Sequence, residues 1–212
     1  MTIYRFENDA MCSLENLALA EGYGTIAGID EAGRGALAGP VVAACVVLDP
    51  QNIPAGILDS KKLTDRQRRT QYKSIRDTAV TVGIGVVGPR IIDAVNIYNA
   101  TAMAMKRAVM DLGLQPDFLL IDAVKLYDIS ISSKSIFKGE DKSVSIAAAS
   151  IIAKVYRDDL MISISKKYPQ YKFFSHKGYA TEEHRKALKM YGPTIQHRYT
   201  YRPVQEAFEQ WR

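Results

Sequence analysis

Apolar residues along the chain alternate between short β-type runs and stretches with helical spacing. Residues 41–48 form the clearest strand, because this run is apolar throughout and rich in β-branched side chains. Residues 118–122 are apolar up to the closing aspartate, which is typical of a strand buried in a parallel sheet. Further strands are expected at residues 25–30, 79–87 and 134–137.

The longest helical pattern covers residues 143–167 and ends before Pro169. Its apolar stripe consists of Val144, Ala148, Ile151, Val155 and Ile162. A second helix is expected from a capping box at Thr64 to about residue 77. Other helices are expected at residues 7–20, 99–112, 181–191 and 203–212. This order of elements predicts an α/β core followed by a helical C-terminal extension.

Composition narrows the class of protein. Apolar residues make up 47% of the 212 residues, which fits one sizeable domain or a domain with an appendage. No apolar run approaches the ~20 residues of a membrane-spanning helix, and the polar first residues lack a signal-peptide pattern. Cys12 and Cys45 are the only cysteines and have no metal-type spacing. A protein of the reducing cytoplasm is expected, without a membrane partner.

Charge is distributed unevenly along the chain. Residues 1–124 contain 12 basic and 14 acidic side chains, whereas residues 125–212 contain 16 basic and 9 acidic ones. An acidic first half joined to a basic second half suits a metal site beside a surface that binds a polyanion. An ordinary solvated surface explains the same distribution, so charge leaves both readings open.

The most informative segment places Asp30 and Glu31 directly before Gly33-Arg34-Gly35. Adjacent carboxylates at a strand end suit hard divalent cations, and a turn of small residues lets a ligand approach the backbone. Because alternate strand residues face opposite sides, we expect the strand to end or bend between the two acids. The pattern points to metal-dependent chemistry on a phosphate or a sugar.

A competing motif overlaps this segment. Gly33, Gly35 and Ala38 match the dinucleotide fingerprint G-x-G-x-x-A, and Asp59 follows at about the required distance. That fingerprint must open a helix, whereas here the glycines lead through Pro40 into a β-type run. A nucleotide P-loop motif is also absent from the sequence. The dinucleotide reading is therefore disfavoured.

Two more acids are candidates for the same site. Asp122 closes the apolar strand, where a parallel sheet presents its ligands. Asp158 lies on the long helix about 20° from Ile151, inside the apolar stripe, whereas Asp159 lies about 80° away. A carboxylate inside an apolar stripe is costly unless it is paired or metal-bound, which favours Asp158. Four carboxylates would suit two Mg²⁺ or Mn²⁺ ions.

The basic tail contains His176, His184 and His197, which lack metal-type spacing. We interpret them as packing or surface residues, one of which could assist proton transfer. Tyr179 lies between basic residues and could stack on a sugar or a base. Composition alone favours a packing role for this tyrosine.

Together these blocks resemble the bacterial ribonuclease HII family, the type 2 ribonucleases H. The resemblance covers roughly residues 24–200. The matching blocks include Gly28-Ile-Asp-Glu-Ala-Gly-Arg-Gly35, Asp59-Ser-Lys-Lys-Leu63, Ile121-Asp122, Lys138-Gly139, Ala147 to Lys154 with Arg157-Asp158, Lys177-Gly-Tyr-Ala-Thr181, and His197-Arg198.

The resemblance implies an α/β fold with a ribonuclease H-like mixed five-stranded sheet flanked by helices. We expect residues 1–168 to form the catalytic core and residues 169–212 a substrate-binding extension, within one compact and monomeric unit. The implied activity is hydrolysis of RNA in RNA–DNA hybrids and incision 5′ of single ribonucleotides in duplex DNA. The products would carry a 3′-hydroxyl and a 5′-phosphate.

The resemblance also implies roles for individual residues. Asp30, Glu31, Asp122 and Asp158 would hold two divalent ions, Mn²⁺ or Mg²⁺. Gly33, Arg34 and Gly35 would sense the ribose 2′-hydroxyl, and Tyr179 would stack on the neighbouring deoxyribose, giving a preference for junctions. Lys61 and Lys62 are also expected to bind substrate.

Two departures from the family pattern concern loops. Ala123-Val124 stands where a glycine commonly follows the third acid, and Glu140-Asp141 replaces a more usual Asp-Ala. A type 3 ribonuclease H would lack Tyr179 and carry an extra N-terminal domain, for which too few residues precede Asp30. A non-catalytic module that binds hybrids is the alternative from another class, and it should have lost one of the acids.

Overall fold

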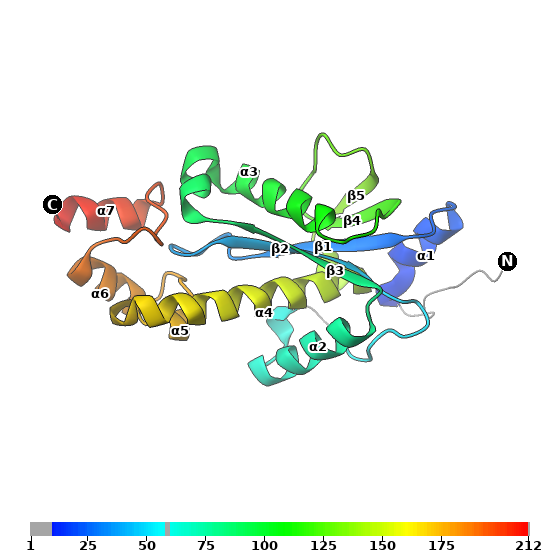
Figure 1. The fold of residues 1–212 in the computed structure, drawn as a ribbon, viewed down its shortest axis with the longest axis horizontal. Helices are drawn as coiled ribbons and strands as arrows, with labels where there is room; N and C mark the ends of the chain where they lie inside the picture. The colour runs from blue at the N-terminus through cyan, green and yellow to red at the C-terminus, as the bar shows by residue number, and fades with distance from the viewer. Residues whose placement is uncertain (1–9, 58–59, 212) are drawn as a thin grey trace.

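The computed structural model describes residues 10–57 and 60–211 and contains a mixed five-stranded sheet of order β3-β2-β1-β4-β5 (Figure 1). The strands are β1 (Ile26–Ala32), β2 (Val41–Val47), β3 (Thr81–Val87), β4 (Phe118–Asp122) and β5 (Ser132–Ile136). β2 pairs antiparallel with β1 and β3, whereas β1, β4 and β5 run parallel. All five predicted strands are present within one or two residues of the expected bounds.

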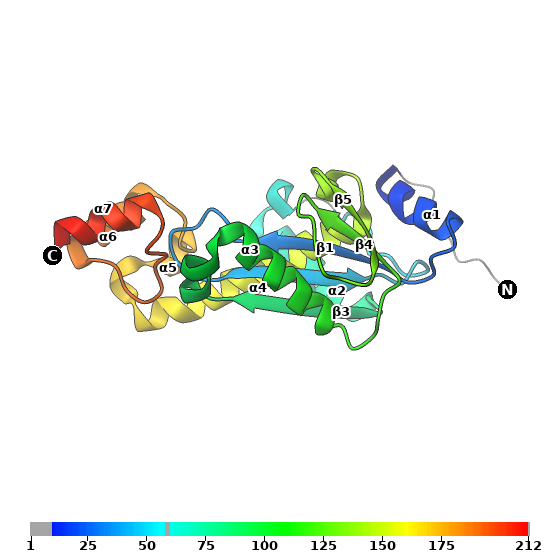
Figure 2. The ribbon, with the colours of Figure 1, turned by 90° about the horizontal axis from the view of Figure 1, so that it is seen from above.

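Helices cover both faces of the sheet (Figures 1 and 2). The α-helices are α1 (Ser13–Ala20), α2 (Asp65–Thr78), α3 (Pro89–Met110), α4 (Val144–Lys167), α5 (Phe173–His176), α6 (Glu182–Tyr191) and α7 (Arg202–Trp211). On β1, Ile26 and Ala32 belong to the core packed with α4, whereas Ala27 and Ile29 belong to the core packed with α3. The alternation of the strand thus divides its side chains between two buried cores.

Two glycines let the helices approach the sheet closely. A Cβ at Gly28 would lie 2.1 Å from the backbone carbon of Ser145 on α4. A Cβ at Gly85 on β3 would lie 1.8 Å from the carbonyl oxygen of Ala104 on α3. Glycine at these positions therefore sets the short distance between sheet and helices.

Local signals place several helix starts. Thr64 and Gln67 form the predicted capping box of α2, and Ser143 caps α4 by accepting a hydrogen bond from the Ile146 amide at 3.2 Å. The predicted helix 99–112 is too short at its start, since α3 begins at Pro89. Asn96 interrupts α3 with φ 67° and ψ 167°, so this helix consists of two segments joined at a kink.

The C-terminal helices gather at the end of the sheet toward which β1 runs (Figures 1 and 2). Tyr171, Phe173 and Leu188 from this part share a buried cluster with Leu37 and with Met161 of α4. The C-terminal extension therefore packs directly on the core. The division into a catalytic core of residues 1–168 and a substrate-binding extension of residues 169–212 remains a prediction. Among the described helices, none is long and apolar enough to cross a membrane.

Candidate metal centre and substrate cavity

Three of the predicted acids meet at the end of two neighbouring strands. Ile29 of β1 pairs with Ile121 of β4 in parallel, so the residues that follow each of them lie side by side. Ligand oxygens of Asp30, Glu31 and Asp122 all lie within 4.8 Å of one another. This separation lets the three carboxylates share a divalent cation.

The strand does not end between Asp30 and Glu31, so this form of the prediction is wrong. β1 continues through Ala32, with Asp30 opposite Ala44 and Glu31 opposite Ala43 of β2. The register with β4 stops at Ile29 and Ile121, so β1 has no β4 partner beyond that point. We infer that this free edge lets the longer Glu31 side chain reach the same group of oxygens as Asp30.

The electrostatics of the three carboxylates favour a cation. Burial and the negative charges of Glu31 and Asp122 raise the pKa of Asp30 well above its ordinary value. Burial also raises the pKa of Glu31, against the opposing effect of Arg34 at 3.3 Å. The Oε2 atom of Glu31 is buried and has no hydrogen-bond partner in the part of the chain that the structure describes. A divalent cation would satisfy this oxygen and offset the repulsion.

Glu140 is a further acid beside this group of carboxylates, and it was not predicted as a site residue from the sequence. It lies in the short 3-10 helix Gly139–Asp141, and its negative charge helps to raise the pKa of Asp122. The Gly139 amide also donates to Asp122 Oδ1 at 2.7 Å, which fixes the loop against the strand end. Among the described residues, Glu140 Oε2 is buried without a hydrogen-bond partner, while Oε1 accepts from Lys61 Nζ at 2.9 Å.

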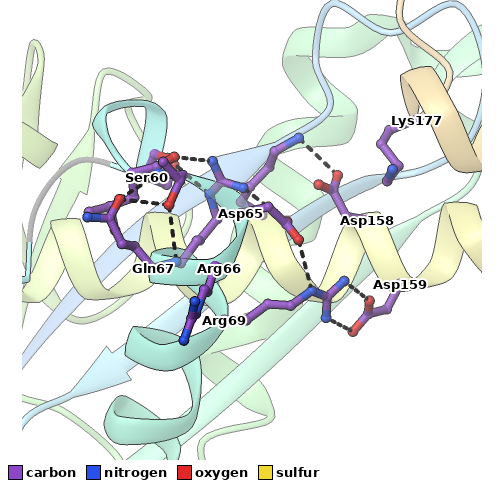
Figure 3. A network of polar contacts seen from close by, with 12 residues as sticks. Ser60, Asp65, Arg66, Gln67, Arg69, Asp158, Asp159 and Lys177 are labelled. Atoms are coloured by element: carbon purple, nitrogen blue, oxygen red, sulfur yellow. Dashed lines mark hydrogen bonds and ion pairs between the residues drawn. The ribbon is translucent and has the colours of Figure 1, made fainter.

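Asp158 is not brought into the group of three carboxylates among the described residues. Its Oδ1 accepts a hydrogen bond from Lys154 Nζ at 2.9 Å along α4. Asp159 lies on the same helix and pairs with Arg69 of α2 at 2.7 Å (Figure 3). The buried position of Asp158 was predicted correctly, but a lysine offsets the cost of its burial in this structure.

A cavity of about 330 Å³ opens over the carboxylates. Of the predicted substrate-binding residues, Gly33, Arg34, Lys61 and Tyr179 line it. Gly35 follows in the same loop without lining the cavity, and the side chain of Lys62 and all of Asp59 lie outside the described residues. Lys154 and Arg68 also line the cavity. Neither residue was predicted to bind substrate, although Lys154 ends one of the matching blocks.

The carboxylates give the metal-free protein a specific pH dependence. Burial, with repulsion from Glu140 and Glu31, raises the pKa of Asp122 from 3.8 to about 6. Between these values the folded state binds more protons than the unfolded state, so the free energy of unfolding falls as pH rises. Urea unfolding in EDTA should therefore give a lower contribution from this site at pH 7 than at pH 4.5. Asp122→Asn should reduce this decline; an identical decline in the variant would contradict the assignment.

Solved structures with this fold identify the class of protein. A ribonuclease H2 from Pyrococcus horikoshii OT3 matches with a TM-score of 0.75 and 26% identity, over 89% of this chain and 99% of that one. The ribonuclease HII of a PCNA:RNase HII complex from Archaeoglobus fulgidus matches with a TM-score of 0.73 and 26% identity, over 84% and 96% of the two chains. The fold and the acidic site define a protein of the ribonuclease H class.

Sequence comparison specifies the family. A family model described as Ribonuclease HII matches residues 27–204. A ribonuclease HII from Acetivibrio thermocellus is 55% identical over 90% of this chain and 75% of its own length. One from Bacillus subtilis is 50% identical over 92% of this chain and 76% of its own length. The chain belongs to the ribonuclease HII family, as the resemblance predicted, and is therefore a metal-dependent nuclease.

Proposed function

We propose that the protein hydrolyses the RNA strand of RNA–DNA hybrids and incises 5′ of single ribonucleotides embedded in duplex DNA, leaving a 3′-hydroxyl and a 5′-phosphate. The observation that carries this proposal is the shared cavity of Asp30, Glu31, Asp122, Gly33 and Tyr179. In that cavity an acidic group suited to cations lies beside a glycine loop and an aromatic ring. The acidic group with its cations would contact a phosphate, the glycine loop would contact a ribose, and the aromatic ring would contact the adjacent sugar.

The metal ligands follow from the same geometry. Asp30, Glu31 and Asp122 would hold two Mn²⁺ or Mg²⁺ ions. Glu140 is a better candidate for the fourth carboxylate than Asp158, because the charge of Glu140 acts on Asp30 and Asp122, whereas Asp158 pairs with Lys154. When bound, the two ions supply an activated water and stabilise the leaving oxygen. Asp158 would instead orient Lys154 in the cavity.

The remaining residues would bind and select the nucleic acid. Arg34, Lys61 and Lys154 place positive charge in the cavity and would neutralise backbone phosphates. Gly33 and Gly35 allow the backbone to approach the 2′-hydroxyl, the group that distinguishes RNA from DNA. Tyr179 would stack on the following deoxyribose. A monomer in the cytoplasm remains our prediction from the sequence.

The direct test uses end-labelled duplex DNA with one ribonucleotide, incubated with Mn²⁺ or Mg²⁺ and separately with EDTA. We expect one incision on the 5′ side of the ribonucleotide, and none in EDTA or on all-DNA duplex. Mass analysis should find a 3′-hydroxyl and a 5′-phosphate at the nick. Tight binding of the duplex without cleavage in either metal would instead support a non-catalytic module.

A further inference from the structure

Arg198 is a fully buried cation whose guanidinium binds backbone carbonyls of the glycine loop, residues 33–39. Its Nη2 donates to Gly33 O at 2.7 Å and to Gly39 O at 3.0 Å. Its Nη1 donates to Arg34 O at 2.7 Å. Within the described residues, no carboxylate forms an ion pair with it. Because burying a charge is costly, these bonds to the loop must offset a substantial penalty.

This arrangement determines where the amides of the glycine loop point. In a trans peptide the carbonyl and the following N–H point in opposite directions. Since Gly33 O and Arg34 O point at Arg198, the amides of Arg34 and Gly35 point away from it. Neither amide has an acceptor in the described part of the chain, so both are available to a ligand. Arg198 thus orients the donors that the proposed function assigns to substrate.

The preceding residue, His197, leads by a second route to Tyr179. The Thr194 amide donates to His197 Nδ1 at 2.9 Å, so the neutral ring carries its proton on Nε2. That proton is directed at His184 Nε2 at 3.1 Å, and His184 Nδ1 then donates to Tyr179 O at 2.9 Å. Burial lowers the pKa of His184 to about 4 and that of His197 to about 3, so both rings stay neutral at pH 7.

Backbone contacts connect the two routes. Gly178 O accepts hydrogen bonds from the Leu37 amide at 2.8 Å and the Ala38 amide at 3.3 Å. Ala38 also forms an isolated β-bridge with His197. The glycine loop, the turn before Tyr179 and the segment around His197 therefore form one hydrogen-bonded unit.

We propose that His197 and Arg198 are positioning residues that set the separation between the glycine loop and Tyr179, and thereby the selectivity for a ribonucleotide followed by a deoxyribonucleotide. The inference rests on the proposed function, in which the loop contacts the ribose and Tyr179 contacts the next sugar. A junction needs both contacts at once. Cleavage within a long hybrid offers no deoxyribose to Tyr179 and depends less on the separation.

Two substitutions at buried positions test the two routes, one substitution for each route. Arg198→Lys keeps the charge but cannot form the planar set of bonds to several carbonyls. In His197→Gln, the side chain cannot both accept from the Thr194 amide and donate to His184 as the two ring nitrogens of His197 do. We expect kcat/KM at a single ribonucleotide to fall about 100-fold in Arg198→Lys, the size of loss that a misplacement near 1 Å produces. The ratio of junction to long-hybrid cleavage should fall in both variants.

A milder variant guards against misfolding. The Tyr201 hydroxyl donates to Arg34 O at 2.8 Å and accepts from Arg198 Nη1 at 3.1 Å. Tyr201→Phe removes only this oxygen, and we expect the junction ratio to fall by about threefold to tenfold. Arg202→Lys is the matched control, because Arg202 is exposed and pairs only locally with Glu206 in the described structure.

For every variant, Mn²⁺ binding is measured by calorimetry and stability by thermal melting, beside the cleavage kinetics. The inference predicts a lower ratio with unchanged Mn²⁺ affinity, while Arg202→Lys behaves as wild type. Equal losses on both substrates, or an unchanged ratio in Tyr201→Phe and Arg198→Lys, would overturn it. If wild type itself does not incise at a ribonucleotide, the proposed function fails instead, so the two failures are distinguishable.

Discussion

Asp122→Asn is expected to lower metal-dependent cleavage by a factor of about 10²–10³, the loss typical when a group that stabilises transition-state charge is removed. The variant keeps the side-chain oxygen that accepts from the Gly139 amide, so the loop should stay in place. It removes one negative charge from the group of Asp30, Glu31 and Asp122. The carboxylate needed to hold a cation at the strand end is therefore lost with little change in shape.

Steady-state cleavage of the single-ribonucleotide duplex, together with a thermal melt in EDTA, measures this effect. The metal-free variant should melt at the same temperature as wild type or higher, because a buried and repelled charge is gone. Asp128→Asn is the matched control. The Asp128 side chain is 93% exposed, and its ion pair with Lys106 is long, at 3.9 Å. Activity near the wild-type level in Asp122→Asn would refute the assignment of the metal centre.

Glu140→Gln is expected to weaken Mn²⁺ binding and to lower kcat by at least about tenfold. The physical reason is the position of Glu140, whose negative charge acts on Asp30 and Asp122 and whose buried Oε2 has no hydrogen-bond partner among the described residues. Asp158→Asn should leave Mn²⁺ affinity unchanged and raise KM, because it only releases Lys154. Calorimetric titration with Mn²⁺ beside cleavage kinetics separates the two acids.

The conservative variant sharpens this comparison. Glu140→Asp keeps the charge with a shorter side chain, so it should retain more metal affinity than Glu140→Gln. A Glu140→Gln protein with wild-type Mn²⁺ affinity, combined with an Asp158→Asn protein that has lost it, would restore the original prediction for Asp158. Equal effects of both substitutions would show that the two acids act through Lys154 and Lys61 rather than by ligation.

The local sequence pattern predicted most of the secondary structure and three acids of the candidate site. Five strands and most helices follow from the alternation of apolar residues, because burial on one face or both imposes a period that the sequence must carry. The capping box at Thr64 and the cap at Ser143 depend only on residues three positions apart. Asp30, Glu31 and Asp122 were identifiable because acids next to apolar strand segments are rare without a function.

The proposed fourth carboxylate shows where reasoning from local sequence is insufficient. Asp158 and Glu140 are both charged residues next to apolar segments, and helical spacing favoured Asp158. Which of them approaches Asp122 depends on the loop after β5, whose path is not encoded by a periodic pattern. The only local signal was the departure at Glu140-Asp141 from the family's usual Asp-Ala.

The contacts of the buried arginine and histidines were visible only in the tertiary structure. Arg198 contacts Gly33 across 165 positions of the chain, and His184 meets His197 ring to ring. Such contacts follow from how the C-terminal helices pack on the end of the sheet, and a charged residue in a basic tail carries no sign of burial. The sequence by itself determined the elements, the family and the three acids of the candidate metal centre. Only the fold decided which distant residues hold those elements at working distance, because that depends on packing between segments rather than on spacing within them.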